Sequence, residues 1–345
     1  MSIPVDVTFH AGWWHKHAGI DFSQEFFNVP DYRIECDLKM RKTLYEKFGH
    51  LGLGEKDPKP RPIMGSDLLA SGYLYSAIMG CEIRYFANTP PEVICANLSD
   101  EEIEALEELD ISKNKVWQDT IRQFEYLNNK YGYVESHLNL QGVQNIAMDL
   151  RGSELFIDYM ANPALAHKLI NRCTDLTLQI GKYISSKSKV LSHGVTAITS
   201  QTIPDVYVTS NCTVEMISQK IYEKFLLEPD LKLAKYFKPF GIHHCGQTME
   251  HVIEGYAKVE DLVFAEVGAG SDISTVRQTL PETWLNLRYS PVRIKTASDH
   301  EIATDIEAMS NSAGKLYSMS CVGIDSETED QRVETFITCV KNLKR

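Results

Sequence analysis

The stretch Gly241-Ile-His-His-Cys-Gly246 places a histidine and a cysteine two residues apart, at the end of an apolar run. Residues 233–242 are typical of a short helix followed by a strand. Because successive side chains of a strand point to opposite faces, we expect His243 and Cys245 to share one face and His244 to lie on the other. Two such side chains at one strand end can bind one metal ion.

A third soft ligand is expected from Cys321, which ends the apolar run Leu316-Tyr-Ser-Met-Ser-Cys321 and precedes a turn. One imidazole and two thiolates that leave a fourth position open are the pattern of catalytic zinc, whereas structural zinc has four protein ligands. The alternative is that Cys245 and Cys321 are buried thiols and that His243 is a hydrogen-bonded core residue.

Length, composition and net charge limit the classes of protein to which the chain can belong. A chain of 345 residues with 43% hydrophobic content can form one large α/β barrel or two ordinary domains. Its net charge of -12 argues against nucleic-acid and anionic-membrane partners, because either needs a basic surface. No basic start followed by an apolar stretch and no run of membrane-spanning length occurs, so we expect a cytoplasmic protein. The eight scattered cysteines favour reduced thiols, some of them ligands, over a disulfide framework.

The first strand is expected at residues 5–9, and residues 10–17 are expected to form a loop after it. Two adjacent tryptophans, Trp13 and Trp14, have little reason to lie in an exposed loop unless they fold over something. They form either one wall of a substrate site or a cap on the core. In the first case the residues that contact substrate are His10, Trp13, Trp14 and His15.

A polar strand face is expected at residues 134–141, where His137, Asn139 and Gln141 alternate with apolar residues. Inside a barrel this face would line a polar cavity, whereas on a sheet edge it would only meet solvent. We expect Asn139 and Gln141 to contact substrate in the first case.

Strands and helices alternate after residue 189, which predicts a parallel sheet. Expected strands are residues 195–199, 240–244, 262–267, 285–289 and 316–321. The number of such units favours one closed (β/α)8 barrel over residues 1–345, in which residues 13–130 contribute helical and loop elaborations. No Gly-x-Gly-x-x-Gly or Walker sequence follows a strand, which excludes the usual phosphate cradles.

The active site of such a barrel lies at the carboxyl ends of its strands. His243, Cys245, Glu266 and Cys321 all occupy such ends in this prediction. Glu266 is the acidic side chain nearest to the expected metal in strand order. We therefore expect it to be catalytic or to serve as a displaceable fourth ligand.

With these motifs the chain resembles the uroporphyrinogen decarboxylase superfamily, and specifically its zinc-dependent corrinoid methyltransferase branch. The resemblance begins near Met64 and covers most of the chain. It is carried by Ile78-Met-Gly-Cys-Glu-Ile83, Leu155-Phe-Ile-Asp-Tyr159 with Asn162-Pro163, the helix at 215–229, His243-His-Cys-Gly246 and Ser320-Cys321-Val. The resemblance implies that His243, Cys245 and Cys321 bind zinc.

The chain also departs from the superfamily. The decarboxylases have an N-terminal Arg-Gln-Ala-Gly-Arg segment and a mid-barrel aspartate, where this chain has His10-Ala-Gly-Trp-Trp14 and Ile198-Thr-Ser-Gln201. Porphyrinogen decarboxylation is therefore not expected. The N-terminal opening of the coenzyme M methyltransferases is not found either.

These observations favour methyl transfer between a small methylated substrate and the cobalt of a corrinoid carried by a partner protein. A methyl ether such as a methoxylated aromatic compound suits the aromatic residues 13–14 best. Transfer from methylcobalamin to a thiol of the coenzyme M type is the alternative within this class. From a different class, the chain could be a metal-free, decarboxylase-like lyase or a binding barrel with structural cysteines.

Overall fold

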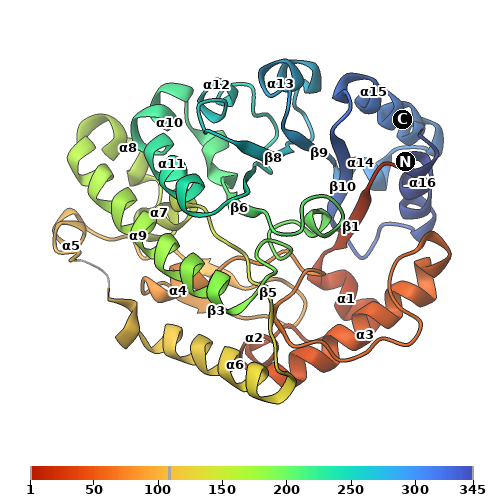
Figure 1. The fold of residues 1–345 in the computed structure, drawn as a ribbon, viewed down its shortest axis with the longest axis horizontal. Coiled ribbons are helices and arrows are strands. Elements are labelled where there is room, and N and C mark those ends of the chain that lie inside the picture. Colours follow the sequence, from red (N-terminus) through yellow and green to blue (C-terminus); the bar gives the residue numbers. More distant parts are fainter. Residues whose placement is uncertain (1, 108–109, 344–345) are drawn as a thin grey trace.

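Eight parallel strands line the middle of the molecule, and helices surround them (Figure 1). The structure, a computed structural model, describes residues 2–107 and 110–343. Six strands form one parallel sheet in the order β1-β10-β9-β8-β7-β6, and β2 and β5 form a parallel pair. The strands are β1 (Val5–Phe9), β2 (Ile63–Gly65), β5 (Glu135–His137), β6 (Tyr207–Ser210), β7 (Phe240–His243), β8 (Leu262–Val267), β9 (Trp284–Tyr289) and β10 (Tyr317–Ile324).

The two sheets meet beside β6. A parallel bridge between Gln141 and Ser210 joins the chain just after β5 to the end of β6. Within the described residues no strand ladder joins β1 to β2, so the curled six-stranded sheet and its two-stranded neighbour do not complete a ring. The parallel α/β architecture predicted from the sequence is therefore confirmed, as an open version of the expected closed barrel.

The helices follow the strands in chain order and cover the outside of the sheets (Figure 1). They are α1 (Ala11–Ala18), α2 (Gln24–Asn28), α3 (Pro30–Phe48), α4 (Leu74–Ile78), α5 (Asp100–Glu104), α6 (Lys115–Tyr131), α7 (Val143–Arg151), α8 (Glu154–Ala161), α9 (Pro163–Lys187), α10 (Gln219–Phe225), α11 (Leu227–Tyr236), α12 (Ile253–Tyr256), α13 (Ile273–Thr279), α14 (Pro291–Thr296), α15 (Asp299–Ala313) and α16 (Asp330–Asn342). An antiparallel hairpin, β3 (Glu82–Arg84) and β4 (Glu92–Ile94), lies in the segment between β2 and β5.

Capping residues set the starts of several helices. Asn162 precedes α9, and its side-chain oxygen accepts the backbone N–H of Leu165 at 3.4 Å, while Pro163 takes the first helical position, where its missing N–H costs nothing. Ser99 and Glu102 form a capping box at α5.

The region before β6 differs from the prediction. Residues 195–199, expected as a strand, lead into a 3-10 helix at Ala197–Gln201, in which the Thr199 hydroxyl donates to the carbonyl of Thr196 at 2.8 Å. Local bonds of this kind favour a turn over a strand in a run rich in threonine. The true strand, β6, has only four residues and is buried along its whole length, so it shows no alternation of apolar and polar side chains.

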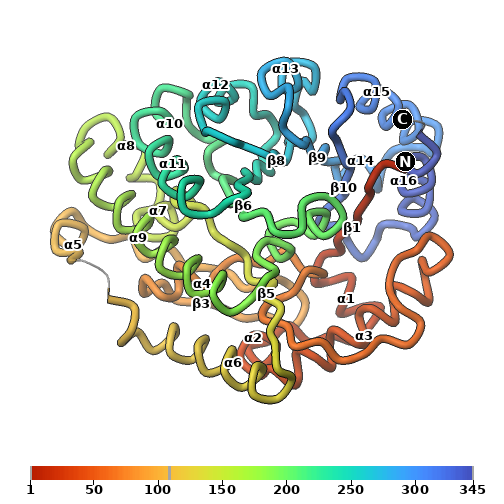
Figure 2. The backbone as a smooth tube through the Cα atoms, in the orientation of Figure 1, coloured from red at the N-terminus to blue at the C-terminus, as the bar shows by residue number. Residues whose placement is uncertain are grey.

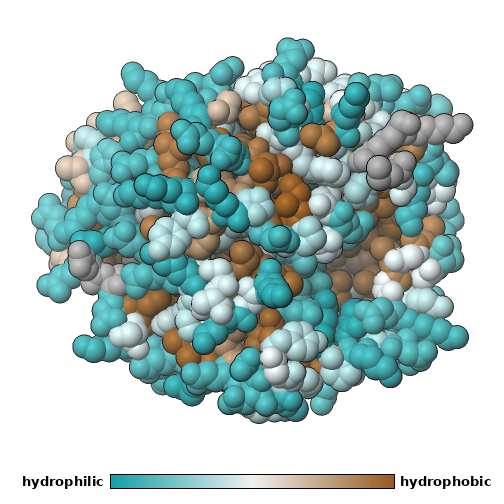
Figure 3. All heavy atoms as spheres, in the orientation of Figure 1, coloured by the Kyte–Doolittle hydropathy of each residue, from teal (hydrophilic) through white to brown (hydrophobic). Residues whose placement is uncertain are grey.

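The first strand and the last helix lie side by side. Helix α16 packs against β1, and the tube in Figure 2 shows the red and blue segments next to each other. The face shown in Figure 3 is mostly hydrophilic, with apolar side chains gathered in its hollows near the middle. Among the described helices none combines the length and the apolar character that a membrane span requires.

Candidate metal centre

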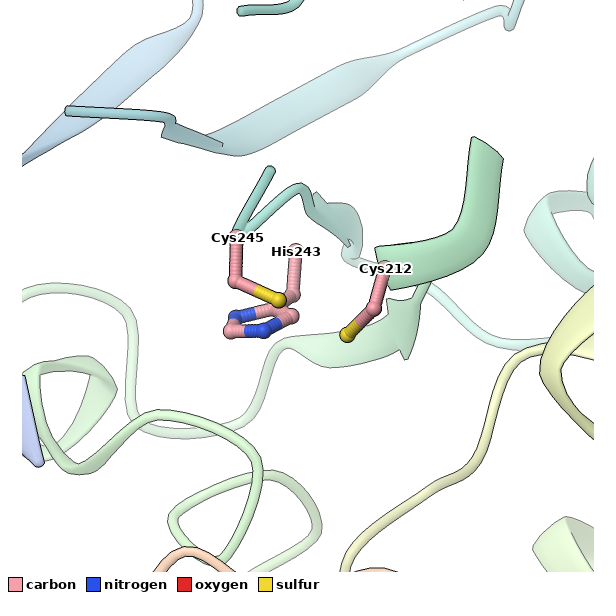
Figure 4. Close-up of side chains that lie close together, drawn as sticks. All are labelled: Cys212, His243 and Cys245. Atoms are coloured by element: carbon pink, nitrogen blue, oxygen red, sulfur yellow. The ribbon is translucent and has the colours of Figure 1, made fainter. Parts of the chain in front are cut away.

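Three side chains with metal-binding atoms converge where β6 and β7 end. His243 is the last residue of β7, Cys245 follows two residues later, and Cys212 follows β6 at the same distance. Their ligand atoms all lie within 4.8 Å of one another. Figure 4 shows the thiols of Cys245 and Cys212 close to the imidazole of His243. One imidazole and two thiols at this spacing form a donor set that suits zinc.

The parallel pairing of β6 with β7 brings the two segments together. Ser210 lies opposite His243 in the strand register, and the backbone N–H of Asn211 donates to the carbonyl of His243 at 2.8 Å. The segment after β6 is held by Asn145, whose side-chain oxygen accepts the Thr213 backbone N–H at 3.0 Å. These bonds fix the backbone on both sides of Cys212.

The imidazole of His243 is oriented by a carboxylate behind it. Its Nδ1 lies 2.6 Å from Oε2 of Glu266, which is fully buried and occupies the neighbouring position of β8. Because Nδ1 is engaged, Nε2 is the nitrogen available to a metal ion. Oε1 of Glu266 lies 3.4 Å from the Arg288 guanidinium. Glu266 is therefore placed to orient the imidazole, as carboxylates behind zinc-binding histidines do.

The pKa values of the three side chains in this group are strongly shifted. The hydrogen bond from the Cys212 thiol lowers the pKa of Cys245 to about 4, assisted by the charge of His243. The same hydrogen bond, together with burial, raises the pKa of Cys212 well above its ordinary value. Burial alone would lower the pKa of His243, but the charges of Glu266 and Cys245 outweigh it and raise it to about 10. Without metal the group therefore holds a thiolate, a thiol and an imidazolium.

Cys321 lies elsewhere than the sequence predicted. On β10 the hydroxyl of the preceding residue, Ser320, accepts a hydrogen bond from Asn286, which neighbours Glu266 in the strand register. Alternation then places Cys321 on the opposite face of β10, next to Tyr289, whose ring packs against α16. Its thiol is fully buried, and burial raises its pKa to about 12. The metal-binding group found among the described residues contains Cys212 instead.

The sequence did contain a signal for Cys212. Cys212 follows Thr209-Ser210-Asn211 and thus stands at a strand end, as His243 does. Since the sequence pattern does not predict β6, it does not identify Cys212 as a strand-end residue. In the structure the chain forms a 3-10 helix at Cys212–Met216 before α10 begins.

The expected substrate wall at residues 10–17 is not a loop but helix α1. Trp13 and Trp14 are fully buried, and the Trp13 ring stacks on Phe9 with centroids 4.0 Å apart. The Trp14 indole N–H donates to the carbonyl of Leu68 at 2.9 Å. The tryptophans therefore pack in the core, as the alternative interpretation held. A polar stretch with two histidines and a lysine obscured the helical pattern of this segment.

His10 and His15, two of the three histidines in residues 10–17, make local contacts. Nδ1 of His10 accepts the Gly12 backbone N–H at 3.1 Å and so caps α1. Nδ1 of His15 lies 2.9 Å from the carbonyl oxygen of Ile20. His10 thus stabilises the start of α1, and His15 stabilises the turn that follows it.

Asn139 and Gln141 have different surroundings. Asn139 lines a cavity of about 300 Å³ and accepts a hydrogen bond from the Ser210 hydroxyl at 3.4 Å. Gln141 is buried, where it accepts the backbone N–H of Tyr75 at 2.9 Å and donates to the Ser76 hydroxyl at 3.1 Å. Gln141 therefore holds α4 in place, while Asn139 faces a space that can take a ligand.

Comparison with known proteins gives a likeness of fold. No family model and no curated protein sequence matches the chain. A solved structure described as a methyltransferase from Methanosarcina mazei superposes with a TM-score of 0.69 at 13% identity, covering 98% of this chain and 93% of that one. A B12-independent methionine synthase from Shewanella sp. W3-18-1, in complex with selenomethionine, matches with a TM-score of 0.46 at 9% identity, over 99% and 96% of the two chains. The chain thus shares the fold of the Methanosarcina mazei methyltransferase.

Proposed function

We propose that the chain is a zinc-dependent methyltransferase whose metal is held by Cys212, His243 and Cys245. The observation that carries this proposal is the convergence of one imidazole and two thiols within 4.8 Å at the carboxyl ends of parallel strands. The fold shared with a methyltransferase supports the reaction class.

The donor set fits zinc in distance and in charge. Zinc lies about 2.3 Å from sulfur and about 2.0 Å from nitrogen, which separates the ligand atoms by roughly 3.5 Å. The three ligand atoms, which lie within 4.8 Å of one another without metal, are already close to this spacing. Two thiolates offset the double charge of the ion, so the centre is nearly neutral and keeps a fourth position for substrate.

Zinc in this group would supply a weak Lewis acid for the oxygen or sulfur of a small substrate. Glu266 would accept the hydrogen bond of Nδ1–H on His243 and so leave Nε2 of this imidazole to bind the ion. The solvent exposure of Cys245 opens one side of the group to a substrate.

We propose further that the methyl group passes between a methyl ether and the cobalt of a corrinoid on a partner protein. An exposed site at the carboxyl ends of the strands suits this reaction, since a protein-bound corrinoid is large and must reach the methyl group from outside. A thiol as methyl acceptor is the second candidate, because a thiolate suits the fourth position of a centre that already binds sulfur.

Two measurements test the proposal. Metal analysis of the purified protein is expected to find about one zinc per chain. Methyl ethers, methylamines and methyl thiols, each incubated with cob(I)alamin or with a free thiol, are expected to yield methylated product with at least one donor. Metal-free protein that transfers no methyl group would leave a lyase or a binding barrel as the better interpretation.

A further inference from the structure

A cavity of about 300 Å³ lies apart from the metal-binding group, between the starts of α3 and α6 and under α4. Its wall contains ten apolar or aromatic side chains from several elements, two formally charged side chains, Arg33 and Asp119, and the imidazole of His137, which lies 3.5 Å from the Glu135 carboxylate. Asp119 is paired with Arg122 outside. The charge that remains to be explained is that of Arg33.

Arg33 is a buried cation whose hydrogen bonds all go to neutral acceptors. The side chain is 1% exposed. Nε and Nη1 donate to backbone carbonyls, and Nη2 donates to Oε1 of Gln123 at 3.0 Å and to the Met64 sulfur at 3.4 Å. No carboxylate of the described residues lies within 4.0 Å of the guanidinium. Burial lowers the pKa of Arg33 to about 10, so the group still carries its charge at neutral pH.

A buried charge is costly unless it is paired with an opposite one. The five N–H groups of Arg33 are satisfied, so what the site lacks is negative charge. The Met64 sulfur is a weak acceptor. A carboxylate bound in the cavity can replace the Met64 sulfur as the acceptor of the hydrogen bond from Nη2 of Arg33. The new hydrogen bond would be charge-assisted and therefore stronger.

The rest of the wall suits an aromatic ring. Phe27, Tyr73 and Tyr85 form an aromatic cluster with ring centroids 5.2 to 5.9 Å apart. All three rings line the cavity. Burial, followed by the nearness of Tyr85, raises the pKa of Tyr73, so its hydroxyl stays protonated and can donate. The volume lies at the small end of the about 300–1,000 Å³ range of ligand pockets, which fits a single-ring compound.

We propose that this cavity binds an aromatic carboxylate, with the ring against Phe27, Tyr73 and Tyr85 and the carboxylate at Arg33. Asn139 marks the side of the cavity that lies toward the metal-binding group: it lines the cavity and accepts a hydrogen bond from Ser210, which lies opposite His243 in the strand register. An aromatic carboxylate that also carries a methyl ether is then the methyl donor, a step that rests on the proposed function.

The test uses calorimetric titration of the full chain with 3-methoxybenzoate and with its neutral analogue 3-methoxybenzyl alcohol. The carboxylate is expected to bind about tenfold more tightly than the alcohol. In Gln123→Glu the new carboxylate supplies the missing partner of Arg33 inside the protein. This variant is expected to melt at a higher temperature and to bind 3-methoxybenzoate about tenfold more weakly, with little change for the alcohol.

Two further variants separate the effect of charge on binding from the effect of cavity volume. Gln118→Glu makes the same charge change at an exposed position of α6 and is expected to bind like the wild type. Ala77→Leu fills part of the cavity from α4, which supplies none of the hydrogen-bond partners of Arg33, and is expected to weaken binding of both ligands. Equal affinity for acid and alcohol, unchanged binding by Gln123→Glu, or no binding of either compound would overturn the proposal.

The outcomes also keep the two proposals apart, because binding is measured without corrinoid and without turnover. Binding of 3-methoxybenzoate that depends on residue 123, in a protein that transfers a methyl group from none of the tested donors to cob(I)alamin or to a thiol, supports the cavity proposal and removes the proposed function. Methyl transfer from other donors by a protein that does not bind 3-methoxybenzoate removes the cavity proposal alone.

Discussion

Nδ1 of His243 lies 2.6 Å from Oε2 of Glu266, at neighbouring positions of two parallel strands. Because the carboxylate holds this nitrogen, the other nitrogen is directed at the thiols of Cys212 and Cys245. The contact therefore prepares the imidazole for a metal ion before one binds.

Glu266→Gln is expected to lower zinc affinity by about 10- to 100-fold, because the neutral amide orients the His243 ring less firmly and makes it less basic. Competition with a chelator measures the affinity. Glu254→Gln, an exposed change on α12, is the control and should leave the affinity unchanged. Equal affinities in wild type and Glu266→Gln would show that the contact does not support metal binding.

The thiol of Cys245 is expected to react as a thiolate in metal-free protein down to acidic pH. Its pKa is lowered to about 4 by the Cys212 hydrogen bond and the charge of His243, so the reactive form predominates above that pH and is lost below it. The rate of alkylation by iodoacetamide, followed by peptide mapping from pH 3 to 9, is expected to reach half its maximum near pH 4. A midpoint near the ordinary thiol value would contradict the geometry of the group. Buried Cys321 is expected to stay unmodified throughout.

Asp6→Asn is expected to stabilise the protein at alkaline pH. Burial, and then the charge of Asp67, raise the pKa of Asp6 to about 7. A raised carboxyl pKa contributes stability that is complete below the unfolded value and is lost as pH rises through the folded value. The melting temperature of Asp6→Asn should therefore exceed that of the wild type at pH 8, and the gain should shrink toward pH 5. A gain independent of pH would argue that Asp6 does not titrate in this range.

Trp13→Ala is expected to lower the free energy of unfolding by about 3–5 kcal/mol, because the change leaves a cavity where the indole is now fully buried. Zinc content should stay that of the wild type. Met160→Ala, at a side chain 76% exposed, is the matched control and should change stability little. If Trp13→Ala lost activity toward substrate but kept wild-type stability, the interpretation of residues 10–17 as a substrate wall would be correct after all.

Much of the architecture could be predicted because most strands and helices carry clear local signals. The spacing of His243 and Cys245 at the end of a buried strand predicted the pair that the structure brings together. Cys212 was missed because β6 is four residues long and buried along its whole length, which removes the alternation that reveals a strand. Helix α1 was missed because a glycine precedes its two tryptophans and the polar run His15-Lys-His17 follows them, and only tertiary packing shows that the tryptophans face the core.

The central claim is that Cys212, His243 and Cys245 bind zinc, and metal analysis of Cys212→Ser beside Cys321→Ser tests it most directly. Both variants remove one thiol, but only Cys212 lies in the metal-binding group, while Cys321 lies on the far face of β10. We predict about one zinc per chain in the wild type and in Cys321→Ser, and a loss of most zinc in Cys212→Ser. Zinc retained by Cys212→Ser and lost by Cys321→Ser would contradict the account.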